Sequence, residues 1–582
     1  MRTSAVTFDS IRQSIIETLS ADPTFKDYNF TAPAISTLID ALAYVSHYHI
    51  RYANFALNET FLDSAQLRKN VVSRARELAY VPYQYSAAKA TVKLRVDGRT
   101  CNVAEDNKVF ENTMFLASSG NTSYIFRSVK QATFEQVDDV YWEAVVDLIE
   151  GTWVEETFKQ DEHYTNRYFL LNDRVDASTI DVTVYQNSSY TSSEKFIPRE
   201  DITSFGPNNP IYYLQEAYNG KLELYFGDGI LSKKLQPGNI IRVKYLVTNG
   251  GVANNIVSFA LMNNISETIG TNNVKIELVE QSHSGCDRED IESIRYNAPK
   301  FFQRQDRNVT TADYNVAITS KFGGWIDSIT SWGGEDNEPY PQYAKIFICV
   351  KPKYTDILSP AQKASIIEHL SKKNLPCIEP VIVDPEYINV LMTLEIDWKQ
   401  YETDYTRKQI QGIIEDKIRD FFKTNITSFK TTFRYSKFLT DLSAIDSSID
   451  SIVTNVKLQQ YLIPDTKITS AYTFNFGNRI VEDSVLIGGW TENNSTTVHT
   501  MYDDGEGNLI HAYGKNKEII GSVDYMKGVV KVNSYLFGNG VNPTKIPVVV
   551  SPYGQNINLS ENYLLKLTNL TVNINELDSY KS

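Results

Sequence analysis

The segment from Cys286 to Lys353 constrains the fold of this chain most, because signals for two helices and a buried strand follow one another closely within it. Asp287 is a candidate N-cap for the first helix, and Pro299 is expected to disturb or end that helix. Thr310 is a candidate N-cap for the second helix, with Asp313 in the third position of a capping-box pattern. The spacing predicts two short helices that begin and end at defined residues.

Two glycines and an apolar run complete the segment. Gly323 and Gly324 are expected to end the second helix, and residues 344–350 have the composition of a buried strand. The charged residues Arg295 and Arg307 are most simply explained as surface ion-pair partners. The segment therefore predicts scaffold rather than catalysis.

Length and charge limit the class of protein. A chain of 582 residues is expected to form several domains, and 42% hydrophobic residues are enough for their cores. The net charge of −14 argues against a general nucleic-acid-binding protein, which needs a basic surface. The 36 tyrosines fit either large protein interfaces or a β-rich protein with half-exposed strands.

The cysteines and the apolar runs indicate a soluble protein that assembles in a reducing cytosol. The spacing of Cys101, Cys286, Cys349 and Cys377 fits neither a zinc site nor a dense disulfide framework. The first nine residues do not resemble a signal peptide. No apolar run approaches the roughly 18 residues that span a bilayer, so no direct membrane insertion is expected.

Residues 1–90 are predicted to form three helices, separated at Asp22-Pro23 and before Pro33 and ending before Val81-Pro82. The second helix carries a near-heptad stripe that could join a bundle with helices of other chains, or could form an intramolecular three-helix core. A basic cluster on the third helix could face an acidic partner or simply lie in water. The candidate partner-binding residues of these two helices are Leu38, Leu42, Val45, His49, Tyr52, Arg68 and Arg74.

The rest of the chain predicts a multidomain α+β protein. Alternating patterns indicate a β-rich domain over residues 91–260, and a helical region over residues 261–340 contains the opening segment. Residues 341–464 alternate strand and helix, which predicts a small α/β sandwich. Residues 465–582 are rich in Gly, Asn, Tyr and Val and predict a β-rich C-terminal domain.

No catalytic, cofactor-binding or metal-binding pattern stands out. A nucleophile elbow, a P-loop, a dinucleotide fingerprint and a zinc-peptidase helix are all missing from the sequence. Adjacent carboxylates such as Glu155 and Glu156 tend to point apart and make poor acid–base pairs. A polysaccharide-degrading site stays open as an alternative, because its carboxylates are brought together only by the fold.

Several spaced motifs together resemble the baseplate wedge family of contractile-tailed, T4-like bacteriophages, the J-like baseplate proteins. They include the run from Leu38 to Tyr44, the runs Asn58–Phe61 and Ala65–Arg68, and the stretch from Tyr225 to Asn254. The resemblance extends in ordered blocks over roughly residues 25–460. Its signature positions are Gly227, Gly229, Asn249, Gly250, Asp290, Arg295, Pro299, Arg307, Thr310, Asp313, Tyr314, Gly323 and Gly334.

The resemblance implies a structural subunit of the tail baseplate in the virion, assembled in the host cytoplasm and without enzymatic activity. Two copies would share a helical bundle with a larger wedge subunit, held by a small clamp subunit. Neighbouring wedges, and in addition the sheath initiator, are implied partners in a ring around the hub. The ring would change conformation when the sheath contracts, with candidate hinges at Val81-Pro82 and residues 249–255. The alternatives are a tail-associated polysaccharide-degrading enzyme and the scaffold of a non-viral contractile injection system.

Overall fold

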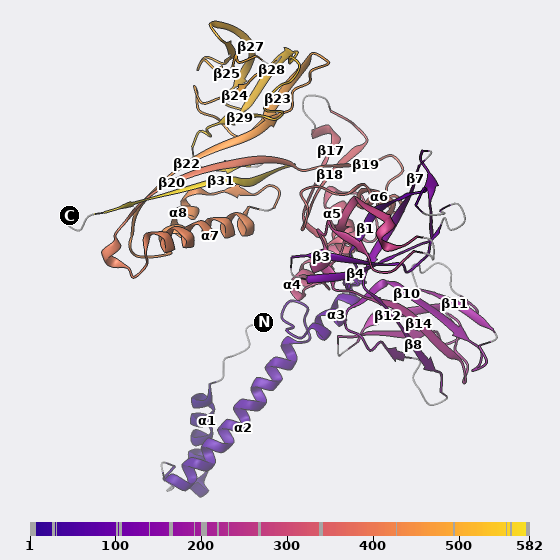
Figure 1. Ribbon diagram of the computed structural model, residues 1–582. Helices are drawn as coiled ribbons and strands as arrows, with labels where there is room; N and C mark the ends of the chain where they lie inside the picture. The colour runs from indigo at the N-terminus through magenta and orange to yellow at the C-terminus, as the bar shows by residue number, and fades with distance from the viewer. Residues whose placement is uncertain are drawn as a thin grey trace. The chain divides into compact units, whose positions relative to one another are not determined.

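The structure is a computed structural model in which the chain forms two compact units (Figure 1). One unit comprises Met1–Asn308 with Val316–Trp325, and the other comprises Val309–Asn315 with Ile326–Ser582. Each unit is described by itself. The described residues are 7–25, 29–30, 32–100, 103, 108–120, 122–138, 140–161, 167–190, 192–198, 206–217, 220–230, 232–265, 269–336, 341–426, 428–492, 495–554, 556–558 and 562–577.

Four helices of the first unit form two separate pairs. Helix α1 (Phe8–Ala21) lies alongside α2 (Pro33–Asn58), and the turn between them contains the predicted break at Asp22-Pro23 (Figure 1). Helix α3 (Arg68–Glu77) packs instead against α4 (Ile291–Arg304), which is distant in sequence. The core between α3 and α4 consists of Ala65, Val71, Val72, Ala75, Tyr80, Ile294 and Ala298. The three N-terminal helices therefore do not share one core.

Strand β1 (Lys89–Asp97) lies at the centre of the first sheet. It pairs antiparallel with β7 (Tyr141–Glu150) along its whole length and with β16 (Val274–His283) on its other side. Its buried residues alternate with half-exposed ones, as the sequence pattern predicts. The remaining strands of this sheet are β3 (Met114–Ser119), β4 (Thr122–Ser128), β6 (Glu135–Gln136) and β15 (Phe259–Leu261).

A second sheet has a core of its own, centred on β10 (Val175–Tyr185) and β14 (Ile240–Val247). Residues 91–260 thus supply strands to both of these sheets and to an antiparallel pair of β2 (Lys108–Val109) with β5 (Ala132–Thr133). The first sheet also takes β16 from beyond residue 260. The other strands of the second sheet are β8 (Thr152–Lys159), β9 (Arg167–Phe169), β11 (Ser193–Pro198), β12 (Ile211–Glu216) and β13 (Leu222–Phe226).

The second unit begins with a small three-stranded sheet. The strand predicted over residues 344–350 is β18 (Lys345–Pro352), with β17 (Ile326–Gly333) antiparallel on one side and β19 (Glu379–Val383) parallel on the other. Helix α6 (Pro360–Ser371) connects β18 to β19 and starts at Ser359 with a complete capping box.

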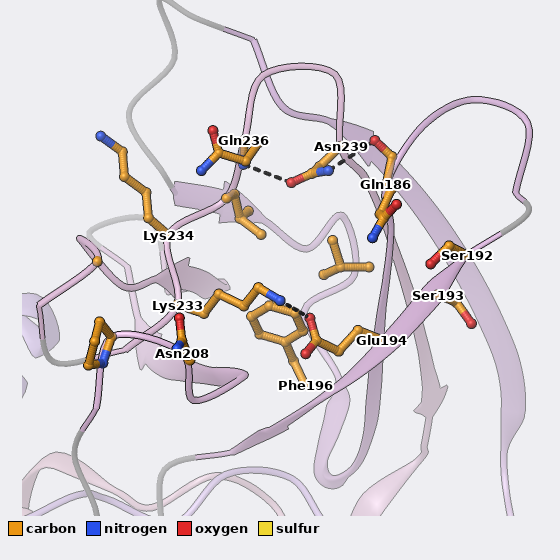
Figure 2. Close-up of a pocket in the computed structure, with 14 residues that line it drawn as sticks. Gln186, Ser192, Ser193, Glu194, Phe196, Asn208, Lys233, Lys234, Gln236 and Asn239 are labelled. Atoms are coloured by element: carbon orange, nitrogen blue, oxygen red, sulfur yellow. Dashed lines mark hydrogen bonds and ion pairs between the residues drawn. The ribbon is translucent and has the colours of Figure 1, made fainter.

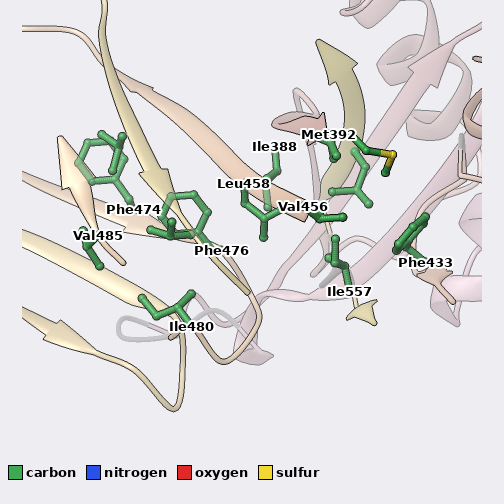
Figure 3. Close-up of a cluster of buried hydrophobic side chains, with 14 of the residues drawn as sticks. Ile388, Met392, Phe433, Val456, Leu458, Phe474, Phe476, Ile480, Val485 and Ile557 are labelled. Atoms are coloured by element: carbon green, nitrogen blue, oxygen red, sulfur yellow. The ribbon is translucent and has the colours of Figure 1, made fainter. Parts of the chain in front are cut away.

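A ten-stranded sheet makes up most of the second unit. Strand β20 (Glu386–Trp398) pairs antiparallel with β22 (Ile449–Leu462) and parallel with β31 (Tyr563–Glu576), the last strand described. Helices α7 (Arg407–Asn425) and α8 (Tyr435–Ser443) bury their apolar residues against it. Figure 3 shows β20, β22 and C-terminal residues in one continuous core. The remaining strands of the sheet are β23 (Ser470–Asn475), β24 (Leu486–Trp490), β25 (His499–Asp503), β26 (Asn508–Tyr513), β27 (Asn516–Asp524), β28 (Val529–Tyr535) and β29 (Ile546–Val550).

This sheet departs from the predicted α/β sandwich of residues 341–464. Strand β18 belongs to the three-stranded sheet, whereas β20 and β22 belong to the sheet that the C-terminal strands complete. The pairing of β20 with β31 joins segments more than 150 residues apart, which local patterns do not encode. The coarse prediction of N-terminal helices followed by a β-rich remainder is confirmed.

Two local predictions for α4 are wrong. The N-cap is Asp290, whose carboxylate accepts the N–H of Glu292, rather than Asp287. Pro299 lies inside α4 and does not end it. Proline removes one backbone hydrogen bond, but Ala298 is fully buried against α3, and this packing keeps the helix continuous.

The predictions for the second helix of the segment are confirmed. The Asp313 N–H donates to Thr310 Oγ1 over 3.3 Å, and the Thr310 N–H donates to Asp313 Oδ2 over 2.8 Å. Helix α5 (Thr311–Phe322) ends directly before Gly323. The capping pattern therefore lies at the start of α5, and the predicted glycines directly follow its end.

Among the described residues, Cys286, Cys349 and Cys377 carry free thiols, and Cys101 lies outside the described residues. Burial raises the pKa of the Cys349 thiol to about 12, which keeps it protonated and unreactive. None of the helices in the described parts of the chain is both long enough and apolar enough to cross a membrane.

Two neighbouring isoleucines of α7 test the packing of the ten-stranded sheet. Ile414 is 1% exposed, so Ile414→Ala should destabilise the protein by about 2–5 kcal/mol in urea unfolding, because it leaves a cavity. Ile413 is 36% exposed, and Ile413→Ala should cost about 1 kcal/mol or less. Equal losses from the two variants would contradict this packing.

Candidate assembly interface

Helix α2 exposes most of its apolar side chains. Only Ile39 and Ala43 of its 26 residues are buried. Side chains that ordinarily form cores are instead 42–66% exposed, namely Leu38, Leu42, Tyr44, Val45, Tyr48, Tyr52, Phe55 and Leu57. A contiguous apolar surface of this extent on a single helix marks an interaction site.

The exposed residues of α2 form two stripes. Leu38, Leu42, Val45 and Tyr52 follow the predicted near-heptad spacing, and the exposed His49 lies in the same row. The second stripe consists of Tyr44, Tyr48 and Phe55. At 3.6 residues per turn the two stripes together cover roughly 160° of the helix circumference.

Three tyrosines contact one another along α2 and link the second stripe to the first. The rings of Tyr44 and Tyr48 stack at 6.2 Å, and those of Tyr48 and Tyr52 meet edge to face at 4.8 Å. Their hydroxyl groups remain free to face water or a partner, except for a 3.2 Å contact between the Tyr48 and Tyr52 hydroxyls. Such a preordered aromatic row suits a protein interface, because little side-chain entropy remains to be lost.

Helix α1 covers only the opposite side of α2. Arg12 Nε donates to Asp40 Oδ1 over 2.6 Å, and Arg12 Nη2 donates to Ser36 Oγ over 3.1 Å. The apolar residues of α1 are half-buried at best, and none is fully buried. The α1–α2 pair therefore leaves both exposed stripes of α2 uncovered.

The base of α2 is fixed by Glu59. Its carboxylate accepts the backbone N–H groups of Gln66 over 2.7 Å and Leu67 over 3.2 Å, and the Asn70 side chain over 2.6 Å. Burial acts to raise the pKa of Glu59, but these hydrogen bonds outweigh it and hold the pKa below its usual value. The turn between α2 and α3 is thus closed by an ionised carboxylate.

A second carboxylate, Glu289, is completely buried between α3 and α4. The Tyr80 hydroxyl lies 2.8 Å from both its oxygens, Ser293 Oγ donates over 2.7 Å and Asn297 Nδ2 donates over 3.0 Å. Burial and the neighbouring Glu289 carboxylate raise the pKa of Tyr80, so this hydroxyl stays a donor. The Glu289 N–H also donates to the carbonyl of Tyr83, which fixes the segment around Val81-Pro82.

The basic residues of α3 are largely used within the chain. Arg68 forms a bidentate ion pair with Glu216, at 2.7 and 3.1 Å, and donates to the Glu289 carbonyl. Arg76 donates to the Glu216 carbonyl over 2.7 Å. Arg74 pairs with Glu77 on the exposed side of the helix. Arg74 and the five α2 residues therefore remain accessible to a partner, whereas Arg68 anchors α3 to β12.

The signature residues of α4 also act within the chain. Arg295 Nε donates to the Leu62 carbonyl over 3.1 Å, and its Nη2 donates to the Ala65 carbonyl. These bonds fix the turn after α2 to α4. Asp290 caps the same helix, so both residues position the base of the exposed helix.

The turn at Asn249 and Gly250 is fixed by a third buried carboxylate. Glu150 accepts Asn249 Nδ2 over 2.7 Å, the Asn249 N–H over 3.1 Å and Thr248 Oγ1 over 2.6 Å. Gly250 has a φ of +69°, and an added Cβ would lie 2.4 Å from Asp287 Oδ1. Only glycine fits this position, and the segment is held firmly.

The remaining signature residues occupy turns and small cores. Gly227 and Gly229 form the predicted tight turn after β13, where Gly229 has a φ of +92°. Gly334 begins a short 3₁₀ helix after β17. Tyr314 is fully buried and its hydroxyl donates to the Asn374 side chain, and Arg307 donates to the Gln305 side chain over 3.3 Å. All of them serve local structure.

One cavity of about 620 Å³ opens beside β10 and β11 in the second sheet (Figure 2). Lys233 Nζ lies 2.6 Å from Glu194 Oε2 across it. Among the described residues that line the cavity, Glu194 is the single carboxylate. Glycoside hydrolysis uses two carboxylates, so this cavity does not support the polysaccharide-degrading alternative.

The described residues also contain no group of three or more His, Cys, Asp or Glu side chains placed to hold a metal ion.

Comparisons with known proteins agree with the position of the exposed helix. Residues 7–80 match a family model for the helical domain of gp6-like baseplate wedge proteins. Residues 310–383 match the model for C-terminal domain I of the baseplate structural protein gp6. The baseplate wedge protein gp6 of Enterobacteria phage T4 is 26% identical over 524 residues, which cover 82% of this chain and 76% of that protein. The chain is a structural subunit of the baseplate wedge.

The predicted resemblance and the location in the tail baseplate of the virion are thereby confirmed. Among solved structures, a chain of the anti-feeding prophage (AFP) baseplate, determined by cryo-EM and 6-fold symmetrised, is similar at a TM-score of 0.29. That match has 11% identity and covers 78% of this chain and 87% of the other. At this TM-score it carries no argument about the fold.

Sequence reasoning missed the second stripe of α2 and the buried carboxylates. The i, i+4, i+11 spacing of Tyr44, Tyr48 and Phe55 could have revealed the stripe. Glu289 directly precedes the N-cap Asp290, but nothing local shows that the first is buried and the second exposed. Long-range packing alone makes that distinction.

The carboxylate between α3 and α4 can be tested directly. Glu289→Gln removes the charge and places an NH₂ group among the three donors Tyr80, Ser293 and Asn297. We expect a loss of about 1–3 kcal/mol in urea unfolding, because a buried donor is left without an acceptor.

The matched control is Glu292→Gln in the same helix, where the side chain is 74% exposed. Its effect should stay within about 1 kcal/mol, since exposed ion pairs contribute little. If Glu289→Gln is no more destabilising than this control, Glu289 is not the anchor of α3 and α4.

Proposed function

We propose that the chain builds the inner ring of the baseplate around the hub, with α2 as its main assembly surface. In this proposal, two copies and a larger wedge subunit contribute helices to one bundle, and a small clamp subunit holds it. The uncovered apolar surface of α2 is the observation that supports this proposal most directly. The matched helical-domain family model spans the same helix.

Packing within the chain favours an intermolecular bundle over the intramolecular alternative. The third predicted helix is occupied with α4, through a core that includes Val71, Val72 and Ile294. It is therefore not available to cover Leu38, Leu42 and Val45. An apolar surface that the chain itself does not bury calls for a partner.

The width of the apolar surface on α2 indicates how many helices can pack against it. A helix that packs against one neighbour typically carries a single apolar stripe. Here α1 covers one side, and two further stripes remain on the other side of α2. The bundle therefore has room for two more helices against each α2, which fits a second copy together with a larger subunit.

The C-terminal strands are proposed to contact the neighbouring wedge, with the sheath initiator as an additional partner. We also propose a change of conformation when the sheath contracts. Val81-Pro82 and residues 249–255 are poor hinges for it, because Glu289 and Glu150 fix both segments through several hydrogen bonds. The movement would then displace α2, its base and the first sheet together.

We infer that the chain acts as a scaffold and not as an enzyme. The family model that matches residues 310–383 is described as a baseplate structural protein, and the described residues that line the cavity beside β11 include no carboxylate pair. A role in a non-viral contractile injection system would use the same assembly surface, and the genes next to this one would distinguish it. Measured release of sugars from bacterial polysaccharide by the purified chain would instead favour the enzyme alternative.

Co-expression with the products of neighbouring tail genes tests the proposed assembly. Size-exclusion chromatography with light scattering should give a stable complex that contains two copies of this chain and the larger subunit. A well-folded monomer that binds none of these products would contradict the proposal.

Two substitutions on the first stripe of α2 should prevent this assembly. The double variant Leu38→Asp and Val45→Asp places two charges, seven residues apart, in the apolar surface. Because buried unpaired carboxylates cost several kcal/mol, we expect complex formation to fall at least roughly 100-fold in a pull-down titration.

The matched control is Ser14→Asp with Ala21→Asp, which adds the same charges at the same spacing on the exposed side of α1. It should assemble like the wild type. Both variants should remain folded by circular dichroism, because all four positions are exposed. Normal assembly of the α2 variant would exclude this stripe as the interface.

A further inference from the structure

The C-terminal part of the ten-stranded sheet contains a chain of hydrogen bonds between two histidines and a glutamate. His499 of β25 places Nδ1 at 3.1 Å from Nε2 of His511 on β26. The other ring nitrogen of His511, Nδ1, lies 3.1 Å from Glu518 Oε1 on β27. Three adjacent strands are thus linked through their side chains as well as through their backbones.

The two histidines are packed within a cluster of aromatic rings. His511 is 2% exposed, and the Trp490 ring stacks on it at 5.6 Å with an interplanar angle of 8°. Trp490 and Tyr513 each stack on His499, and the Tyr513 ring lies tilted against His511. Tyr535 meets His511 edge to face at 5.3 Å. A movement of either imidazole therefore disturbs several rings.

The charged groups around the histidines come from each neighbouring element. Glu518 of β27 is half-exposed, whereas Glu492, which follows β24, is buried. Glu492 accepts Trp490 Nε1–H over 2.6 Å, the Tyr535 hydroxyl over 3.3 Å and the Gly538 N–H over 2.8 Å. The Glu492 carboxylate thus already accepts three hydrogen bonds. It acts on His511 by electrostatic attraction and not by a hydrogen bond.

Proton placement determines whether the bond between the histidines survives. With both rings neutral, His499 Nδ1–H donates to His511 Nε2, and His511 Nδ1–H donates to Glu518. A first added proton can bind His499 Nε2 without breaking either bond. A second proton can bind only His511 Nε2, which then presents an N–H to the N–H of His499 at 3.1 Å and removes the bond.

We propose that His499 and His511 form an acid-sensitive latch, which holds β25, β26 and β27 together at neutral pH and opens when both rings are protonated. The inference goes beyond the assembly role and does not depend on it. Opening would separate two positive charges and disturb the stacked rings around Trp490. As the pH falls, strands β25, β26 and β27 of the ten-stranded sheet would lose stability before the rest of the second unit does.

The pH range follows from burial of His511. Burial lowers the pKa of His511, opposed by the hydrogen bond to Glu518 and supported by the nearby His499. The folded chain then binds fewer protons than the unfolded chain near the ordinary histidine pKa of about 6.5. The contribution of neutral His511 to folding stability is therefore complete above about pH 6.5. This contribution is lost as the pH falls below about 6.5.

Thermal unfolding of the full chain at pH 7.5 and pH 5.5 tests the latch. His511→Phe keeps a ring in the stack but removes the titrating group, and the half-exposed Glu518 can turn to water. We expect the acid-induced fall in Tm to shrink at least about twofold relative to the wild type. A matched control, His369→Phe on α6, should leave the fall in Tm unchanged.

A second variant keeps the test decisive if the phenylalanine does not fit. His499→Asn retains an N–H donor near the position of Nδ1 and cannot be charged. It should unfold at the wild-type temperature at pH 7.5 and resist acid better than the wild type.

Histidine ring NMR titration of the wild type, with resonances assigned from the two variants, provides the second readout. The latch predicts that His499 and His511 titrate in coupled steps, one of them well below the usual histidine pKa. Independent titration of both rings as exposed histidines, or an equal acid-induced fall in Tm for the wild type and both variants, would overturn the proposal.

Discussion

The proposed role of this chain depends on one helix whose apolar side chains are mostly left exposed by the chain itself. Helix α2 runs for 26 residues and buries only Ile39 and Ala43 within its own chain. Helices in proteins are stabilised mainly by packing of an apolar face, and most of that face of α2 is open here. The family match over residues 7–80 spans this helix, and we propose that partner subunits cover its exposed face.

The base of α2 is tied to the rest of the first unit by hydrogen bonds. Glu59 closes the turn after α2, Glu289 joins α3 to α4, and Arg68 connects α3 to β12. The Ala87 N–H donates to Asp176 in the second sheet over 2.8 Å, so the link continues into the body of the unit. Each connection uses a carboxyl or guanidinium group that forms several hydrogen bonds, and removing one partner would leave a buried polar group unpaired. Hydrogen bonds therefore connect the base of α2 with the second sheet of the same unit.

The sequence predicted best where the information is local. The stripe from Leu38 to Tyr52, the reciprocal capping of Thr310 and Asp313, and the end of α5 at Gly323 follow from spacing and turn chemistry, and the structure shows all three. Prediction from the sequence was poor where contacts between distant segments determine the fold. The parallel pairing of β20 with β31 removed β20 from the expected α/β sandwich.

The α4 errors have the same origin. Asp287 and Asp290 are both plausible N-caps by residue type, and Pro299 is an ordinary helix breaker. Packing of Ala298 on α3 and the network around Glu289 decide between these possibilities, and both arise from tertiary contacts. For the assembly surface, the pattern located the first stripe but not the aromatic row of Tyr44, Tyr48 and Phe55. We propose that their partner is another chain, and their exposure reveals them more directly than their periodicity does.

Hydrogen–deuterium exchange across residues 33–58, measured on the isolated chain and on the assembled baseplate wedge, tests the central claim most directly. The account predicts fast exchange of α2 amides in the isolated chain, because packing supports the helix on one side only. In the wedge these amides should become strongly protected, while those of β1 and β20 change little. Equal exchange of α2 in both states would contradict the claim that this helix is the surface on which the wedge assembles.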